Sequence, residues 1–86
     1  MNKVEYIIII NFSTKEEALS YMQSSGLNFS FSVANTEFFN SAGDIISEPE
    51  SYNSFDKGDI SISDKADPLP GELYIENGFL KYYKEI

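Results

Sequence analysis

Residues 3–12 read KVEYIIIINF, and this apolar run is the strongest structural signal in the 86-residue chain. Val, Ile, Tyr and Phe favour strands, and the unbroken run Tyr6–Ile10 is typical of a central strand that is covered on both faces. We therefore expect Lys3–Phe12 to form one strand inside a sheet. Its side chains should alternate between the two faces, with Ile7 and Ile9 on the face opposite to Ile8 and Ile10.

A helix is expected directly after this strand. Ser13 and Thr14 stand three residues ahead of two glutamates, which is the spacing of a capping box. Acids in the first turn also suit the helix dipole, and Gly26 is placed to adopt the left-handed conformation that ends a helix. The sequence predicts a helix over about residues 14–25, with a buried face formed by Ala18, Leu19 and Met22.

The middle of the chain carries weaker signals. Residues 27–33 alternate between apolar and polar, which predicts a strand with one buried and one exposed face. This strand can pair in parallel with the first through a right-handed crossover, or lie antiparallel with another strand between them. Asn40–Lys57 resembles a long loop, with a short extra strand at Asp44–Ser47 as the alternative. Residues 59–63 alternate again and predict a short strand.

The C-terminal region contains a clear hairpin signal. Asn77-Gly78 separates two strand-like segments, Glu72–Glu76 and Phe79–Lys84, which predicts a two-residue type I′ turn. The turn fixes the register. The face expected in the core pairs Ile75 with Leu80 and Leu73 with Tyr82. The other, amphipathic face pairs Glu76 with Phe79, Tyr74 with Lys81 and Glu72 with Tyr83.

These elements predict an α+β fold over residues 1–86 as a single domain. We expect a small mixed or antiparallel sheet of four to five strands with one helix packed on one face, in the order β-α-β-β-β-β, and residues 37–59 as a long acidic loop region. One helix covers only one face of a sheet, so the side of Ile7 and Ile9 needs another cover. The candidates are a second copy of the chain, a different protein, or the long loop with Ile45, Ile46, Tyr52 and Phe55.

Charge excludes several functions. Fourteen acids against six lysines give a net charge of −8, which argues against direct nucleic-acid or anionic-membrane binding, since both need clustered basic residues. No stretch approaches the roughly 20 apolar residues of a membrane span. The first residues have too short an apolar run for a secretion signal, so we expect a cytoplasmic protein, in the host cytoplasm if a phage encodes it.

This composition contains few of the side chains that usually carry out catalysis. The chain contains no His, Cys or Arg, and it carries no phosphate-binding loop or hydrolase motif. A carboxylate pair, such as Glu48 with Glu50, is better explained as solvated loop acids. The aspartates at 56, 59, 64 and 67 depart from the spacing of a calcium-binding loop. The sequence therefore predicts no enzyme, no cofactor and no metal.

The acids are concentrated in one third of the chain. Residues 37–67 contain eight acids and two lysines, a net charge of −6. Acids held at fixed spacing can imitate a phosphate backbone. The candidate partner-binding residues are Glu37, Asp44, Glu48, Glu50, Asp56, Asp59, Asp64 and Asp67, with the aromatic residues Tyr52, Phe55 and Tyr74.

Two functional hypotheses follow. The first is a small inhibitor that blocks a basic, nucleic-acid-binding protein, with an enzyme as the expected partner, by imitating nucleic acid. Phage anti-defence proteins and nuclease-immunity proteins are similarly small and acidic. The alternative is a structural or assembly protein that forms a homo-oligomer, such as a homodimer, through the second face of the sheet.

Overall fold

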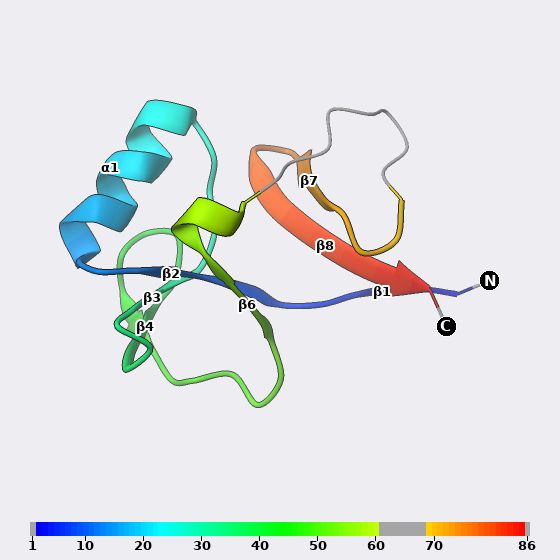
Figure 1. Ribbon diagram of the computed structural model, residues 1–86, viewed down its shortest axis with the longest axis horizontal. Coiled ribbons are helices and arrows are strands. Elements are labelled where there is room, and N and C mark those ends of the chain that lie inside the picture. Colours follow the sequence, from blue (N-terminus) through cyan, green and yellow to red (C-terminus); the bar gives the residue numbers. More distant parts are fainter. Residues whose placement is uncertain (1, 61–68, 86) are drawn as a thin grey trace.

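The computed structural model describes residues 2–60 and 69–85 and is an α+β fold with two sheets and one α-helix in this part of the chain (Figure 1). The five-stranded sheet has the order β5-β4-β3-β2-β6, and the three-stranded sheet has the order β1-β8-β7. The elements are β1 (Lys3–Glu5), β2 (Ile8–Phe12), α1 (Lys15–Ser25), β3 (Phe31–Val33), β4 (Glu37–Phe39), β5 (Ile45–Ile46), β6 (Asn53–Asp56), the 3₁₀ turn η1 (Lys57–Asp59), β7 (Leu73–Glu76) and β8 (Phe79–Glu85).

The expected single strand over Lys3–Phe12 is wrong, because this run contributes to both sheets. β1 pairs antiparallel with β8, and the pairing continues to the Tyr6 amide, which donates to the Tyr82 carbonyl at 3.0 Å. The chain then leaves β8 and enters the other sheet as β2, between β3 and β6 (Figure 1). Ile7 lies at this branch point, and 55% of its surface is exposed.

The β2-α1-β3 unit confirms the predicted helix and settles one open alternative. The Thr14 Oγ1 caps the helix by accepting from the Glu17 amide at 3.2 Å, and Gly26 ends it with φ +72°. β2 and β3 are parallel. The predicted buried face is correct for Ala18 and Met22 but wrong for Leu19, which is exposed. The side of the helix that packs on the core runs through Ala18, Tyr21 and Met22.

The middle of the chain contains more strands than expected. The strand predicted over residues 27–33 is reduced to β3, and Ser32, expected on a wet face, is fully buried. Asn40–Lys57 is not one loop. The alternative strand near Asp44–Ser47 is confirmed as β5, and β6 pairs in parallel with β2. Asp59 lies in η1 rather than a strand, and residues 61–63 lie outside the described residues.

The C-terminal hairpin is confirmed, and four of its five predicted pairs are observed: Leu73 with Tyr82, Tyr74 with Lys81, Ile75 with Leu80 and Glu76 with Phe79. Glu72, predicted opposite Tyr83, precedes β7. Asn77 and Gly78 both have positive φ, at 55° and 81°, as a type I′ turn requires. Two details of burial differ from expectation. Ile75 is exposed, whereas Tyr74 and Tyr83 on the opposite face are buried, with the Lys3 Nζ 4.4 Å from the centre of the Tyr83 ring.

The two faces of the five-stranded sheet are both covered. On the helix side, Ile8, Ile10 and Phe31 join one hydrophobic core with α1 and β8. On the other side, Ile9 is 1% exposed, and Phe38 packs edge-on against Tyr52 from the β5–β6 connection at 5.7 Å. Tyr52 of the long segment therefore covers this face, as expected, but Ile45 is 68% exposed and Phe55 lies on the helix side, opposite Ile10. The chain buries Ile9 by itself.

Candidate partner-binding surface

The acids predicted to bind a partner are exposed wherever the structure describes them. Glu37 begins β4, Asp44 precedes β5, Glu48 and Glu50 lie in the connection to β6, Asp56 ends β6, and Asp59 ends η1. Asp64 and Asp67 lie outside the described residues. The six described acids are therefore available to solvent or to another molecule.

These acids surround the sheet instead of forming one cluster. β4 and β5 lie at one edge of the five-stranded sheet, β6 forms the other edge, and β2 and β3 lie between them. Asp44 and Asp56 are therefore on opposite edges, and the connection with Glu48 and Glu50 runs between them. In the described part of the chain, no three acidic side chains come close enough to hold a metal ion.

The described lysines have partners other than the six described acids of this segment. Lys57 pairs with Glu17 at 3.3 Å, and Lys81 approaches Glu5 at 3.9 Å. The other described lysines stand over aromatic rings: Lys3 over Tyr83, Lys15 over Phe39 and Lys84 over Tyr6. Within residues 2–60 and 69–85, none of the six acids from Glu37 to Asp59 forms an ion pair.

Tyr52 is the predicted aromatic residue most closely tied to an acid. Its hydroxyl donates to the Glu48 Oε2 at 2.9 Å, while its ring rests edge-on against Phe38. The hydrogen bond to the Glu48 carboxylate raises the pKa of Tyr52 above 10.0, with partial desolvation and the negative charge acting in the same direction. Tyr52 thus holds Glu48 in a defined position on the surface.

Phe55 and Tyr74, also predicted to bind a partner, face the interior. Phe55 lies opposite Ile10 in the β2–β6 pair and packs against Tyr82 at 5.8 Å. Tyr74 is 6% exposed, and its buried hydroxyl has no hydrogen-bond partner among the described residues. Desolvation raises the pKa of Tyr74 above 10.0, and the nearby Glu5 and Glu76 charges add to this. Packing alone accounts for both rings.

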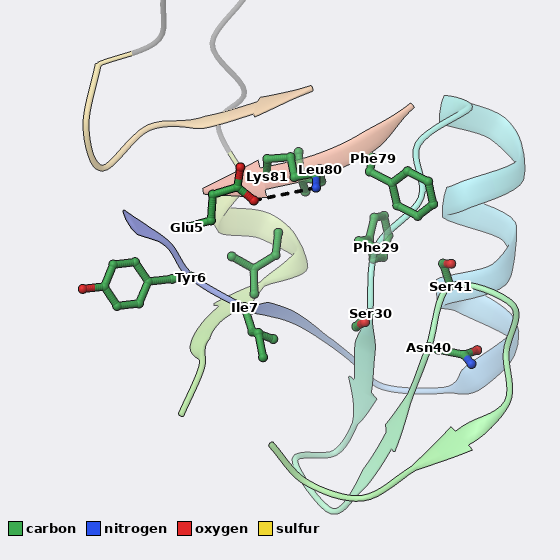
Figure 2. Close-up of a pocket in the computed structure, with 11 residues that line it drawn as sticks. Glu5, Tyr6, Ile7, Phe29, Ser30, Asn40, Ser41, Phe79, Leu80 and Lys81 are labelled. Atoms are coloured by element: carbon green, nitrogen blue, oxygen red, sulfur yellow. Dashed lines mark ion pairs between the residues drawn. The ribbon is translucent and has the colours of Figure 1, made fainter. Parts of the chain in front are cut away.

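A groove that the sequence did not reveal lies where the two sheets meet (Figure 2). Its volume is about 450 Å³. Ile8, Phe29 and Leu80 are its buried residues, and Ile7 and Phe79 expose apolar surface at its sides. The remaining lining residues are polar or amphipathic: Glu5, Tyr6, Ser30, Asn40, Ser41 and Lys81. Two features of the sequence bear on it: the side of Ile7, for which several covers were possible, and Phe79 on the amphipathic face of the hairpin.

A second, polar hollow of about 350 Å³ lies at the carboxyl ends of β2 and β6. The Asn11 Oδ1 accepts hydrogen bonds from the Ser32 hydroxyl at 3.0 Å and the Asn35 amide at 3.2 Å. The Asn11 amide nitrogen donates to the Asp56 Oδ1 at 3.4 Å. Since its polar groups bond one another and the Lys57–Glu17 pair lies at its side, this hollow is explained by packing of the sheet end.

Comparison with known proteins does not indicate a function for this chain. No family model, no curated protein and no solved structure matches this chain. Among the described residues, no helix has the length and hydropathy needed to cross a membrane. The function must therefore be argued from the charges and cavities of this chain.

Proposed function

We propose that this chain is a small acidic inhibitor of a basic, nucleic-acid-binding protein, and that it occupies the surface on which the nucleic acid would lie. The observation that carries the proposal is the set of six exposed acids between Glu37 and Asp59, none of which is paired with a described lysine. Exposed carboxylates at defined positions can take the place of phosphates on a basic surface.

The charge distribution supports a rapid, salt-sensitive encounter. A net charge of −8 on 86 residues produces a long-range field that attracts a basic partner and accelerates association. Salt screens such a field over about 8 Å at physiological ionic strength. Because the acids lie along both edges of the sheet, they suit a concave basic surface, such as a nucleic-acid-binding cleft, better than a flat one.

The homo-oligomer alternative receives less support. It requires the side of Ile7 and Ile9 to be open to a second copy, and in the single chain Ile9 is 1% exposed whereas Ile7 is 55% exposed. Phe38 on the same side is also buried and is in contact with Tyr52. Of the two residues expected in the interface, Ile7 alone offers apolar surface to a partner.

The test compares two variants that change the net charge equally. In the first, Asp44, Glu50 and Asp59 are replaced by lysine; in the matched control, Glu16, Glu76 and Glu85 are. The immobilised proteins are exposed to a lysate of the source cells, with and without added duplex DNA, at low and high salt, and bound proteins are identified by mass spectrometry.

We expect the wild-type chain to retain a basic nucleic-acid-binding protein that DNA or high salt displaces. The segment variant should bind it at least about tenfold more weakly, a loss of roughly 1.4 kcal/mol, while the control variant stays close to the wild type. Equal losses in both variants would indicate a general charge effect. Retention that DNA does not displace would contradict nucleic-acid mimicry.

A further inference from the structure

We propose that the groove between the two sheets receives an arginine side chain of the basic partner, an inference that rests on the proposed function and adds an anchoring site to it. The groove is lined by parts of the chain that are far apart in sequence: the β1–β2 junction, residues 29–30, residues 40–41 and the start of β8 (Figure 2). It is therefore a product of the fold and not of a single motif.

The apolar sides of the groove fit the aliphatic and planar parts of arginine. Ile7 and Phe79 are 55% and 44% exposed, and both line the groove together with the buried Phe29. An arginine side chain can lay its methylene groups along such surface and stack its guanidinium on an aromatic ring. A volume of about 450 Å³ lies in the range of sites that enclose small ligands, so a long side chain can enter it.

One carboxylate at the groove can bind a cation. Glu5 and Lys81 both line the groove and form a loose ion pair, with the Lys81 Nζ 3.9 Å from the Glu5 Oε2, so an arginine would compete with Lys81 for this carboxylate. This separation exceeds hydrogen-bond length, so the Glu5 oxygens keep acceptor positions for a guanidinium. A guanidinium can donate two parallel hydrogen bonds to one carboxylate, which an ammonium cannot do.

The groove is continuous with the acidic segment. Asn40 and Ser41 line its far side, and the Asn40 amide donates to the Asp44 carbonyl at 2.9 Å. The Asn40 Oδ1 also accepts from the Asp44 amide at 3.0 Å, so the turn that carries Asp44 is held beside the groove. A partner attracted by the acids of this segment would therefore meet the groove at the edge of the same surface.

The test is a titration of the isotope-labelled full chain, followed by the amide signals in NMR spectra. The probes are three capped tripeptides, Gly-Arg-Gly, Gly-Lys-Gly and Gly-Leu-Gly. Glu5→Gln and Phe79→Ala alter the groove; Glu85→Gln and Ile75→Ala are matched controls on exposed residues outside its lining. Thermal unfolding of each variant checks that the fold is retained.

We expect the arginine peptide to shift the signals of Glu5, Ile7 and Phe79, and to bind at least about threefold more tightly than the lysine peptide. Each groove variant should weaken this binding by at least about threefold, and neither control should. Equal binding of the leucine peptide, or no shift at the groove, overturns the inference. Shifts confined to the acids of residues 37–59 overturn the groove as the site yet leave the proposed function intact, since that depends on the capture experiment.

Discussion

The helix side of the five-stranded sheet and the segment over residues 37–59 both contain aromatic rings, but the rings have different surroundings. On the helix side, Phe12 stacks on Phe29 with ring centres 5.9 Å apart, and both residues are buried. In the segment, Tyr52 packs on Phe38 with one edge only and uses its hydroxyl to hold Glu48. The first region excludes water, whereas the second presents charge to it.

This difference indicates how a small chain can separate stability from binding. An 86-residue domain has a thin stability margin and needs most of its apolar surface in one core. The exposed acids contribute little to that core, so they can be placed for a partner without a large loss of stability. Substitutions in the two regions should therefore change different measured properties, and the following experiments test that separation.

The largest expected effect is in the core. Phe31→Ala removes a fully buried ring from the start of β3 and should lower the free energy of unfolding by about 3–5 kcal/mol, enough to unfold much of the protein. Chemical denaturation followed by circular dichroism measures this. Ile45→Ala is the control, because this side chain is 68% exposed and its loss should cost less than about 0.5 kcal/mol. Similar losses in the two variants would contradict the assignment of the core.

Substitutions of Tyr74 test whether this aromatic residue belongs to the core or to the partner-binding surface. Its ring is buried, but within residues 2–60 and 69–85 its hydroxyl has no hydrogen-bond partner, so Tyr74→Phe should stabilise the fold by about 1 kcal/mol or more. Desolvation raises the pKa of Tyr74 in the folded state. The unfolded chain therefore loses this proton first above pH 10.0, and wild-type stability should fall there more steeply than that of the variant.

Denaturation of the wild type and Tyr74→Phe across this pH range makes the comparison, with Tyr74→Ala as a variant that also loses the ring and should be destabilised. Binding to a captured partner should be the same for the wild type and Tyr74→Phe. A destabilised Phe variant would show that the hydroxyl has a partner after all. A loss of binding without loss of stability would place Tyr74 in the interface, as the sequence suggested.

The elements that the sequence predicted well are set by neighbouring residues. Thr14 and Gly26 define the two ends of α1, and Asn77-Gly78 fixes both the turn and the register of the hairpin, whatever the rest of the chain does. These signals act over three or four residues. The residues next to each signal are therefore sufficient to predict the helix ends and the hairpin.

The features that the sequence did not reveal depend on distant pairing. The run Tyr6–Ile10 is apolar throughout, so nothing in it marks the point where the chain leaves β8 and joins β3. β6 contains a single apolar side chain, Phe55, and gains its place by pairing with β2. The exposure of the acids followed from their charge, but the groove requires four separate segments between Glu5 and Lys81 to meet and leaves no local pattern.

The smallest expected effect lies in the acidic segment. Glu48→Gln removes the carboxylate that accepts the Tyr52 hydrogen bond and should bring the pKa of Tyr52 back toward 10.0. In the wild type, the raised pKa means that this interaction supports the fold below pH 10.0 and is lost as the pH rises through the folded-state pKa. Because both residues are at the surface, stability at neutral pH should change by less than about 0.5 kcal/mol.

NMR titration of labelled tyrosine rings measures the pKa of Tyr52, with Glu50→Gln as the control that should leave this pKa unchanged. An unaltered Tyr52 titration in Glu48→Gln would mean that Tyr52 does not hold Glu48, and that the acids of this segment are less ordered than the proposed mimicry requires.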